Sequence, residues 1–229
     1  MTFMIMIKGG EYLMDKSSIQ RQKYSMPEDM EYTVSLNTDK DHIKYIKRME
    51  QIIRSSMEYR DYIAYLKEYV DMTHCAFFNN VENGQGSKVR IEIHHEPLTL
   101  FDIVKTVLNK HIDESIPLND LYIADEVMNL HYTNKVGLVP LSKSMHQIIH
   151  NSNEIIIPLN LVYGDYKAFL EEYNDYLDED LIDKIERKIN DTRSFNQEMA
   201  DKLSPSYVYV EVDGYSLPSK VPIAKPDVA

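Results

Sequence analysis

The stretch Gly137–Asn151, with the sequence GLVPLSKSMHQIIHN, combines a short apolar segment with a segment that carries His146 and His150. Leu138 to Leu141 has the length and apolar character of a buried strand, and the residues after it favour a helix. Two histidines four positions apart share one face of a helix, with about 5–6 Å between them. That spacing suits one metal ion, although such pairs also arise by chance.

A second pair of histidines ends the segment Val89–His95, which has the sequence VRIEIHH. Its alternation of polar and apolar residues predicts a strand that delivers His94 and His95 at its end. By themselves, adjacent histidines after a strand are common in turns and on surfaces. If this strand pairs with Leu138–Leu141, however, the following helix completes a ββα arrangement around the histidines.

The segments IEIHH at 91–95 and GLVPLSKSMHQIIH at 137–150 resemble the HNH, or ββα-metal, endonuclease superfamily, and in particular HNH-type proteins of tailed phages. The resemblance covers residues 72–152. It implies a bacteriophage enzyme, a metal-dependent endonuclease that hydrolyses phosphodiester bonds in DNA in the host cytoplasm. Two predicted helices between the segments would then be a long insertion, which a fold tolerates when the ends of the loop stay close.

The resemblance also implies a role for each histidine. His94, His146 and His150 would bind one divalent metal ion, Zn²⁺, Mg²⁺ or Mn²⁺, which acts as a Lewis acid on the phosphate. His95 would be the general base that deprotonates the attacking water, since a histidine pKa near ~6.5 suits neutral pH.

One position departs from the family pattern. Where the superfamily has an asparagine that orients the general base, this chain has Gly137. Asn134, three residues earlier, is the expected catalytic replacement, and His131 is a second candidate.

Composition limits the partners. The net charge of −12 argues against a protein that coats nucleic acid without sequence preference, because such affinity comes from Lys and Arg that neutralise phosphates.

Cys75 is the single cysteine, which excludes an intramolecular disulfide and favours a reducing cytoplasm. No run reaches the ~18–20 apolar residues of a membrane span, so no membrane partner is expected. DNA would approach a basic rim formed by Lys88, Arg90, Lys105, Lys135 and Lys143.

The pattern along the chain predicts an α+β fold with a ββα-metal (HNH-like) core and a long helical insertion. It adds an N-terminal helix, a C-terminal acidic helical pair and a short β-hairpin. The expected organisation is an arm at 1–38, an HNH-like domain with its preceding helix at 39–162, the acidic pair at 163–200, and a strand with an extended tail at 201–229. Within it we expect a helical break near 54–56, helices at 100–111 and 118–132, a hairpin joining 74–78 to 88–93, and a buried or edge segment at 154–162.

The acidic helices support an alternative function. Their exposed carboxylates suit either a solubilising face or a surface that binds a protein partner or mimics DNA. The chain would then be a non-catalytic interaction protein on an HNH scaffold, or a component of a larger viral assembly. The residues concerned are Glu171, Glu172, Asp175, Asp178, Glu179, Asp180 and Asp183.

Overall fold

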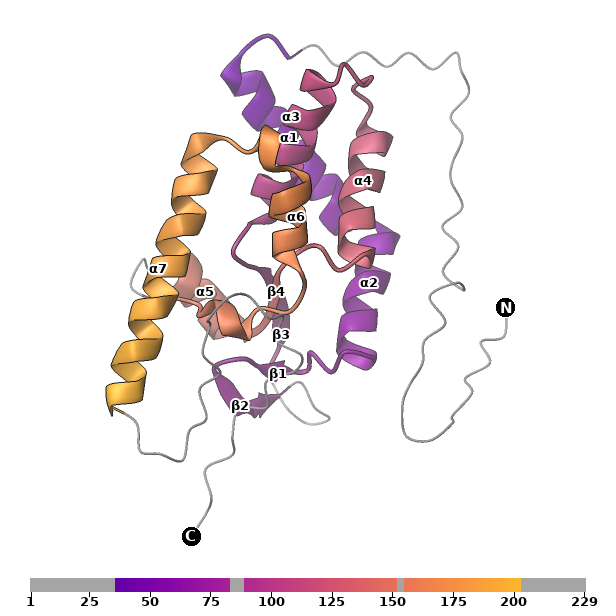
Figure 1. Ribbon diagram of the computed structural model, residues 1–229. Coiled ribbons are helices and arrows are strands. Elements are labelled where there is room, and N and C mark those ends of the chain that lie inside the picture. The colour runs from indigo at the N-terminus through magenta and orange to yellow at the C-terminus, as the bar shows by residue number, and fades with distance from the viewer. Residues whose placement is uncertain (1–35, 83–88, 152–154, 203–229) are drawn as a thin grey trace, which may run out of the picture. The chain divides into compact units, whose positions relative to one another are not determined.

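The computed structural model describes residues 36–82, 89–151 and 155–202, and it shows an α+β fold (Figure 1). Its α-helices are α1 (Asp39–Ser55), α2 (Met57–Glu68), α3 (Leu100–Asp113), α4 (Asp120–Tyr132), α5 (Lys143–Asn151), α6 (Tyr166–Glu172) and α7 (Glu179–Lys202). Its strands are β1 (His74–Cys75), β2 (Phe78–Glu82), β3 (Ile91–His95) and β4 (Leu138–Ser142). Among these described residues, no helix is both long enough and apolar enough to cross a membrane.

The first two helices are separated by one residue that caps both. The N–H of Ser56 donates to the carbonyl of Ile53 at 3.1 Å, which closes α1, while its Oγ accepts from the N–H of Tyr59 at 3.0 Å and opens α2. The predicted break near 54–56 is therefore confirmed. The sequence offers Asp39 or Asp41 as the cap at the start of α1, but the cap is Thr38, and Asp41 completes its capping box.

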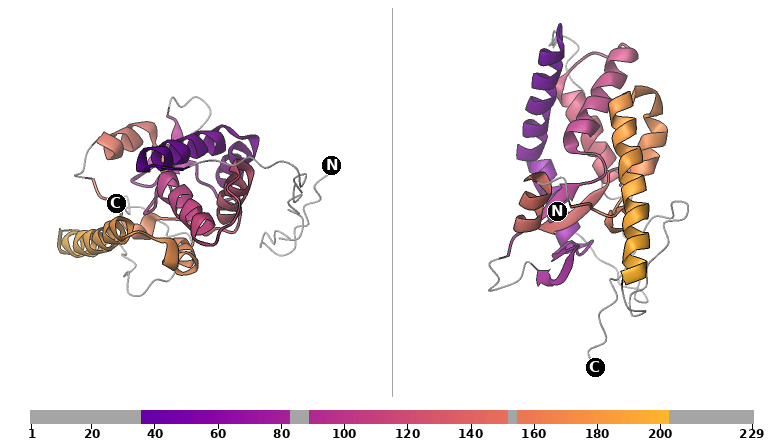
Figure 2. Two further views of the ribbon diagram at one scale, coloured as in Figure 1. Left: turned by 90° about the horizontal axis from the view of Figure 1, so that it is seen from above. Right: turned by 90° about the vertical axis from the view of Figure 1, so that its left-hand side faces the viewer.

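The two helices expected between the histidine segments are present as α3 and α4. Both end in a Schellman motif with a residue of positive φ after the cap, Ser115 (φ 55°) after α3 and Asn134 (φ 62°) after α4. For α4, the N–H of Lys135 donates to Leu130 and that of Asn134 to His131, the paired bonds that define this motif. In Figure 2, α1, α3 and α4 lie together as a group with α7 at its margin.

The strands pair differently from one of our expectations. The predicted neighbours β3 and β4 do pair, antiparallel, with Ile91 opposite Ser142 and His95 opposite Leu138. The hairpin expected to join 74–78 to 88–93 is wrong: the chain turns back earlier, so that β1 pairs with β2. Ala76 donates to the carbonyl of Pro140 at 2.8 Å, which ties this small hairpin to β4.

The segment at 154–162 that was expected to be buried or at an edge is buried at Ile157, Leu159 and Val162, and it contains the 3₁₀ helix η2 (Leu159–Leu161). Helix α6 is followed by the 3₁₀ helix η3 (Asn174–Tyr176). Phe169, Tyr173 and Leu181 belong to the same core cluster as residues of α1 to α4. The acidic helices thus share one core with the rest of the described chain. The predicted strand at 207–212 and most of the N-terminal arm lie outside the described residues.

Glu126 of α4 connects three elements. Its Oε2 accepts from His111 Nε2 at 2.8 Å, and its Oε1 accepts from Lys110 Nζ at 2.8 Å and from the hydroxyl of Tyr173 at 2.6 Å. Burial would raise the pKa of this carboxyl, but the bonds from His111, Lys110 and Tyr173 outweigh it and lower the pKa to about 2. The carboxylate therefore joins α3 to α4 and joins both to the C-terminal segment.

Replacing Glu126 with alanine is expected to lower the free energy of unfolding by about 2 kcal/mol, because partly buried donors lose their acceptor. Denaturant unfolding at neutral pH measures the loss. Glu186→Ala on the exposed face of α7 is the control and should change stability by less than about 0.5 kcal/mol. Equal effects of the two substitutions would contradict a connecting role for Glu126.

Candidate metal centre

The pairing of β3 with β4 decides which way the predicted histidines face. His94 lies opposite Val139 and His95 opposite Leu138. Successive side chains of a strand point to opposite faces of a sheet. Val139 belongs to a small core cluster between β4, η2 and the start of α6, whereas Leu138 belongs to the large helical core. His94 therefore lies on the side of the small core cluster, and His95 lies on the side of the large helical core.

Helix α5 follows β4 directly and brings two more histidines to the His94 face. Ser142 Oγ accepts a hydrogen bond from the N–H of Met145 at 3.3 Å, as expected for a serine that caps a helix. His146 and His150 are one turn apart, and their ring centroids are 4.6 Å apart. Because α5 begins directly after β4, both histidines are held close to the paired strands β3 and β4.

The three predicted metal ligands converge. One possible ligand atom from each of His94, His146 and His150 lies within 4.8 Å of the others. The ring centroid of His94 is 5.1 Å from that of His146 and 5.2 Å from that of His150. His94 is buried, His146 half-buried and His150 exposed, so the cluster runs from the interior to the surface. The structure brings these side chains together, and the metal ion stays a prediction.

Two carboxylates adjoin the cluster, both from the strand region of His94. Glu92 Oε2 accepts from His146 Nδ1 at 2.7 Å, which leaves Nε2 of that ring available to a ligand. Glu96 Oε2 lies 3.5 Å from His94 Nε2, and its other oxygen is paired with Lys188 of α7. Burial would raise the pKa of Glu96, but His94 and Lys188 together hold it below its usual value.

His95 lies on the other side of the sheet, in the core. It is 4% exposed, and its Nε2 donates to His131 Nε2 at 2.9 Å. The Nδ1 of His131 donates in turn to the carbonyl of Val127 at 2.7 Å. The ring of Tyr59 stacks on that of His95, with 6.4 Å between the ring centroids. The ring of Tyr62 packs edge-on against that of His131, with 5.4 Å between the centroids. Burial, followed by the neighbouring His131, lowers the pKa of His95 well below its usual value.

This position does not suit the base role expected for His95. A general base must lie within hydrogen-bond reach of the water that it deprotonates, whereas His95 is enclosed by aromatic rings and bonded to His131. The residue that orients His95 is thus His131, the second of the two candidates.

Asn134, the first candidate, lies elsewhere. Its positive φ ends helix α4, and its carbonyl accepts from the N–H of Asp165 at 2.6 Å. Asparagine tolerates this backbone conformation better than most residues. Within the described part of the chain, its contacts serve the end of α4 and the segment before α6.

The basic rim is partly neutralised by acidic neighbours. Lys135 pairs with Glu172, Lys105 pairs with Asp178, and the 73% exposed Arg90 side chain lies 3.4 Å from Glu92. Lys143 is exposed at the start of α5. Lys88 lies outside the described residues.

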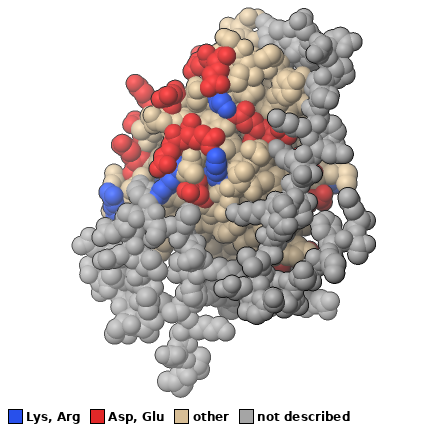
Figure 3. Space-filling view, turned by 45° about the vertical axis from the view of Figure 1, so that its right-hand side comes forward, with Lys and Arg blue, Asp and Glu red and all other residues tan. Residues whose placement is uncertain are grey.

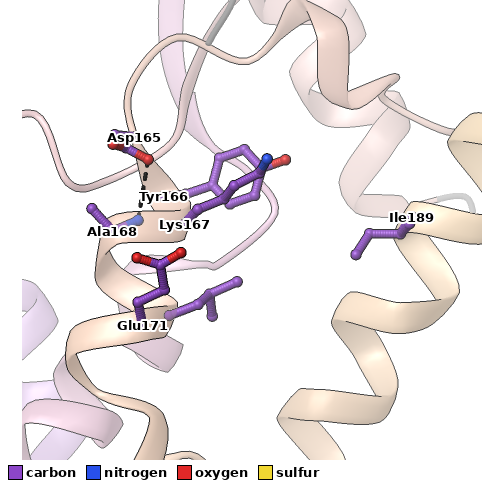
Figure 4. A pocket seen from close by; sticks show the side chains of 7 residues that line it. Asp165, Tyr166, Lys167, Ala168, Glu171 and Ile189 are labelled. Atoms are coloured by element: carbon purple, nitrogen blue, oxygen red, sulfur yellow. Dashed lines mark hydrogen bonds between the residues drawn. The ribbon is translucent and has the colours of Figure 1, made fainter. Parts of the chain in front are cut away.

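A separate pocket of about 490 Å³ lies between α6 and α7, away from the histidines. Its wall is formed by residues of α6 with Ile189 on the facing side (Figure 4). Asp165 at its rim accepts from the N–H of Ala168 at 3.1 Å and so caps α6. No catalytic arrangement follows from these contacts.

The family model for the Bacteriophage G278-like virion proteins matches residues 10–208 of the 229-residue chain. The chain belongs to this family. Comparisons with curated proteins and with solved structures found no match.

This membership corrects the HNH resemblance. The matched family is one of virion proteins, and it spans both histidine segments, the N-terminal helices and the acidic C-terminal helices. The short motifs IEIHH and GLVPLSKSMHQIIH therefore misled us about ancestry. A phage protein was expected and is confirmed, whereas nuclease activity and DNA binding gain no support from the match.

Gly137 also has a structural explanation that needs no lost asparagine. A Cβ atom at this position would lie 1.9 Å from the carbonyl oxygen of Glu96 and 2.7 Å from Cγ1 of Val162. The carbonyl of Gly137 accepts from the N–H of Glu96 at 3.0 Å. Glycine is required here because the backbone of Glu96 and the side chain of Val162 occupy the space that a Cβ atom would need.

We did not place Glu92 or Glu96 beside the histidine cluster from the sequence, although the strand pattern does indicate the position of Glu92. Glu92 precedes His94 by two positions on an alternating strand, so it shares the His94 face. Glu96 follows the strand, and its contact with Lys188 depends on the position of α7, which no local pattern indicates.

Proposed function

We propose that this protein is a structural component of the phage particle, which acts by binding other virion proteins and not by catalysis. Membership of a virion protein family is shown by the match; the structural role is our proposal. The observation that carries it is the burial of His95, the side chain on which the catalytic hypothesis depended. An activity that needs this imidazole to meet water would require the core around Tyr59 and Tyr62 to open.

An acidic surface supports binding to a protein neighbour. Exposed carboxylates follow one another along α6, η3 and the first turns of α7. Figure 3 shows a face on which acidic side chains gather and outnumber the basic ones. We define the acidic face by Glu171, Glu172, Asp175, Glu179, Asp180 and Asp183.

The charge of the acidic face also limits what it can bind. Lys135 neutralises part of it through Glu172, but Glu179, Asp180 and Asp183 lie together at the start of α7. Such a surface repels DNA, whose phosphates need Lys and Arg. It is complementary to a basic protein surface, and complementary charge raises association rates and fixes orientation.

The enzymatic function remains an untested prediction, as does location in the host cytoplasm. Phosphodiester hydrolysis at the histidine cluster would need a base other than His95. Nicking of supercoiled plasmid by wild type but not by His150→Ala would favour it over our proposal.

Purified phage particles provide the test of the structural role. We expect the protein in particles at a fixed copy number by quantitative mass spectrometry. Carbodiimide, which joins carboxylates to amines in contact, should link the acidic face to lysines of one neighbouring virion protein. Asp180→Lys with Asp183→Lys should reduce incorporation at least about tenfold, as expected when like charges meet across an interface.

The control is Asp61→Lys, a charge reversal at an exposed position of α2. It should enter particles as wild type does. Absence of the protein from particles would refute the proposed role. Equal incorporation of both charge-reversed proteins would refute the part assigned to the acidic face.

A further inference from the structure

We infer that His94, His146 and His150 bind one transition-metal ion of the Zn²⁺ class, which fastens helix α5 to the paired strands β3 and β4. This inference goes beyond membership of the virion and does not depend on it. Imidazole nitrogens are preferred by Zn²⁺, Co²⁺ and Ni²⁺, whereas Mg²⁺ and Ca²⁺ prefer oxygen ligands.

The nitrogen positions are close to those of a tetrahedral site. Zn–N bonds of 2.0–2.1 Å place two ligand nitrogens about 3.3 Å apart. The Nε2 atoms of His146 and His150 are 3.0 Å apart, and all three ligand atoms lie within 4.8 Å. Small side-chain rotations therefore suffice to bring His94 to bonding distance, without movement of strand β3 or helix α5.

The carboxylate of Glu92 orients the ring of His146, one of the three proposed ligands. A metal-binding histidine usually donates its second ring N–H to a carboxylate or carbonyl, which fixes the tautomer and the ring orientation. The 2.7 Å bond from His146 Nδ1 to Glu92 matches this arrangement. Glu92 lies two residues before His94, so the strand that supplies one ligand also orients another.

Helix α5 has little else to hold it in place. It has only nine residues, and none of them is fully buried. Isolated helices shorter than ~12–15 residues are marginal in water. Met145 and Ile149 pack partly on the small core cluster, and the histidines face β3. An ion shared by β3 and α5 would anchor the end of the helix that carries His150.

Three protein ligands leave a fourth position. Glu96 Oε2 lies 3.5 Å from His94 Nε2, but the other oxygen of this carboxylate is paired with Lys188 of α7. Among the described residues, the ligand atoms that converge come from the three histidines. His150 is exposed, so water can complete the coordination in the isolated chain.

The test uses the untagged full-length chain, stripped of metal with a chelator and titrated with Zn²⁺ or Co²⁺ alone. We expect one equivalent to bind by calorimetry, tetrahedral Co²⁺ to give visible absorption bands, and the Tm to rise by several degrees, since an ion bound only by the folded state stabilises it. No stoichiometric binding by wild type would overturn the inference.

Three variants separate coordination from folding. His150→Ala, at an exposed position, should keep the metal-free Tm and lose the Co²⁺ bands and the Zn²⁺-dependent shift. Glu92→Ala should weaken Zn²⁺ binding 10–100-fold, as loss of an orienting carboxylate does. His42→Ala on α1 is the control and should bind as wild type does. Wild-type affinity in His150→Ala would overturn the assignment.

Discussion

Replacing Gly137 with alanine is expected to lower the free energy of unfolding by about 3 kcal/mol or more, at the upper end of overpacking effects. The new methyl group would meet the Glu96 carbonyl oxygen at 1.9 Å and Val162 at 2.7 Å. A flexible side chain could move aside, but a backbone carbonyl cannot move without shifting the chain. Glu96 is also bonded through its N–H to the Gly137 carbonyl and through its side chain to Lys188, so a shift would loosen β3, β4 and α7 together.

Denaturant unfolding of Gly137→Ala and Gly137→Asn measures this effect. The asparagine variant installs the residue that an HNH enzyme carries here, and we expect it to be at least as destabilised and to gain no function. Ser144→Ala, a change to alanine at an exposed position of α5, is the control and should stay within about 0.5 kcal/mol of wild type. A Gly137→Asn protein as stable as wild type would show that the close approach does not constrain this residue.

Helices α1 to α4 could be predicted from the sequence, because their local sequence patterns agree with the packing in the folded protein. They have apolar residues at three- and four-residue steps, and Ser56 lies in the predicted break between α1 and α2. The pairing of β3 with β4 was expected from the ββα resemblance, and the structure shows this pairing although the chain belongs to another family. The convergence of His94 with His146 and His150 follows from that pairing.

The sequence misled us where a contact depends on elements far apart in the chain. The burial of His95 requires α2 and α4 to supply Tyr59, Tyr62 and His131. Alternation along β3 does place His95 opposite to His94, but only the packed helices reveal that this second face is the core. Gly137 was similarly interpreted as a lost asparagine, since nothing local indicates the approach of Glu96 and Val162.

The C-terminal helices illustrate a different limit. Their acidic sequence predicts exposed faces, and Glu171, Glu179 and Asp183 are exposed. Their apolar residues are few, yet Phe169 and Tyr173 enter the main core. The hydroxyl of Tyr173 also donates to Glu126 of α4. The same side chain therefore packs in the core and links the C-terminal segment to α4. Which acidic residues pair and which stay exposed depends on Lys135 and Lys105, from other elements.

Mild acid is expected to destabilise the metal-free protein by about 3 kcal/mol between about pH 6.5 and about pH 4 through His131. Burial lowers the pKa of His131 to about 4, the Arg54 charge acts in the same direction, and the bond to Val127 opposes both. The unfolded histidine binds a proton near pH 6.5, so over this range the unfolded state holds more protons than the native state. Stability is thus full above about pH 6.5 and is lost as the pH falls.

The hydrogen bonds of His131 explain why this side chain stays neutral in the native state. His131 Nδ1 already donates to Val127, so its Nε2 must accept from His95 Nε2. A proton on His131 Nε2 would set two donors against each other at 2.9 Å in a site without water access. His95 has a pKa lowered in the same direction, so it adds to the loss. The carboxyls of Glu96 and Glu126 have lowered pKa values and titrate in a more acidic range.

Denaturant unfolding at several pH values, with a chelator present so that the histidine cluster holds no metal, measures the dependence. His131→Gln removes one titrating group while its side-chain oxygen can still accept from His95, so the slope of stability against pH should fall by about 1.4 kcal/mol per pH unit. Ser144→Ala on α5, which removes no titrating group, should leave the slope at its wild-type value. A wild-type stability that stays flat down to about pH 4.5 would mean that the buried pair is hydrated or already broken. An unchanged slope in His131→Gln would assign the acid sensitivity to other groups.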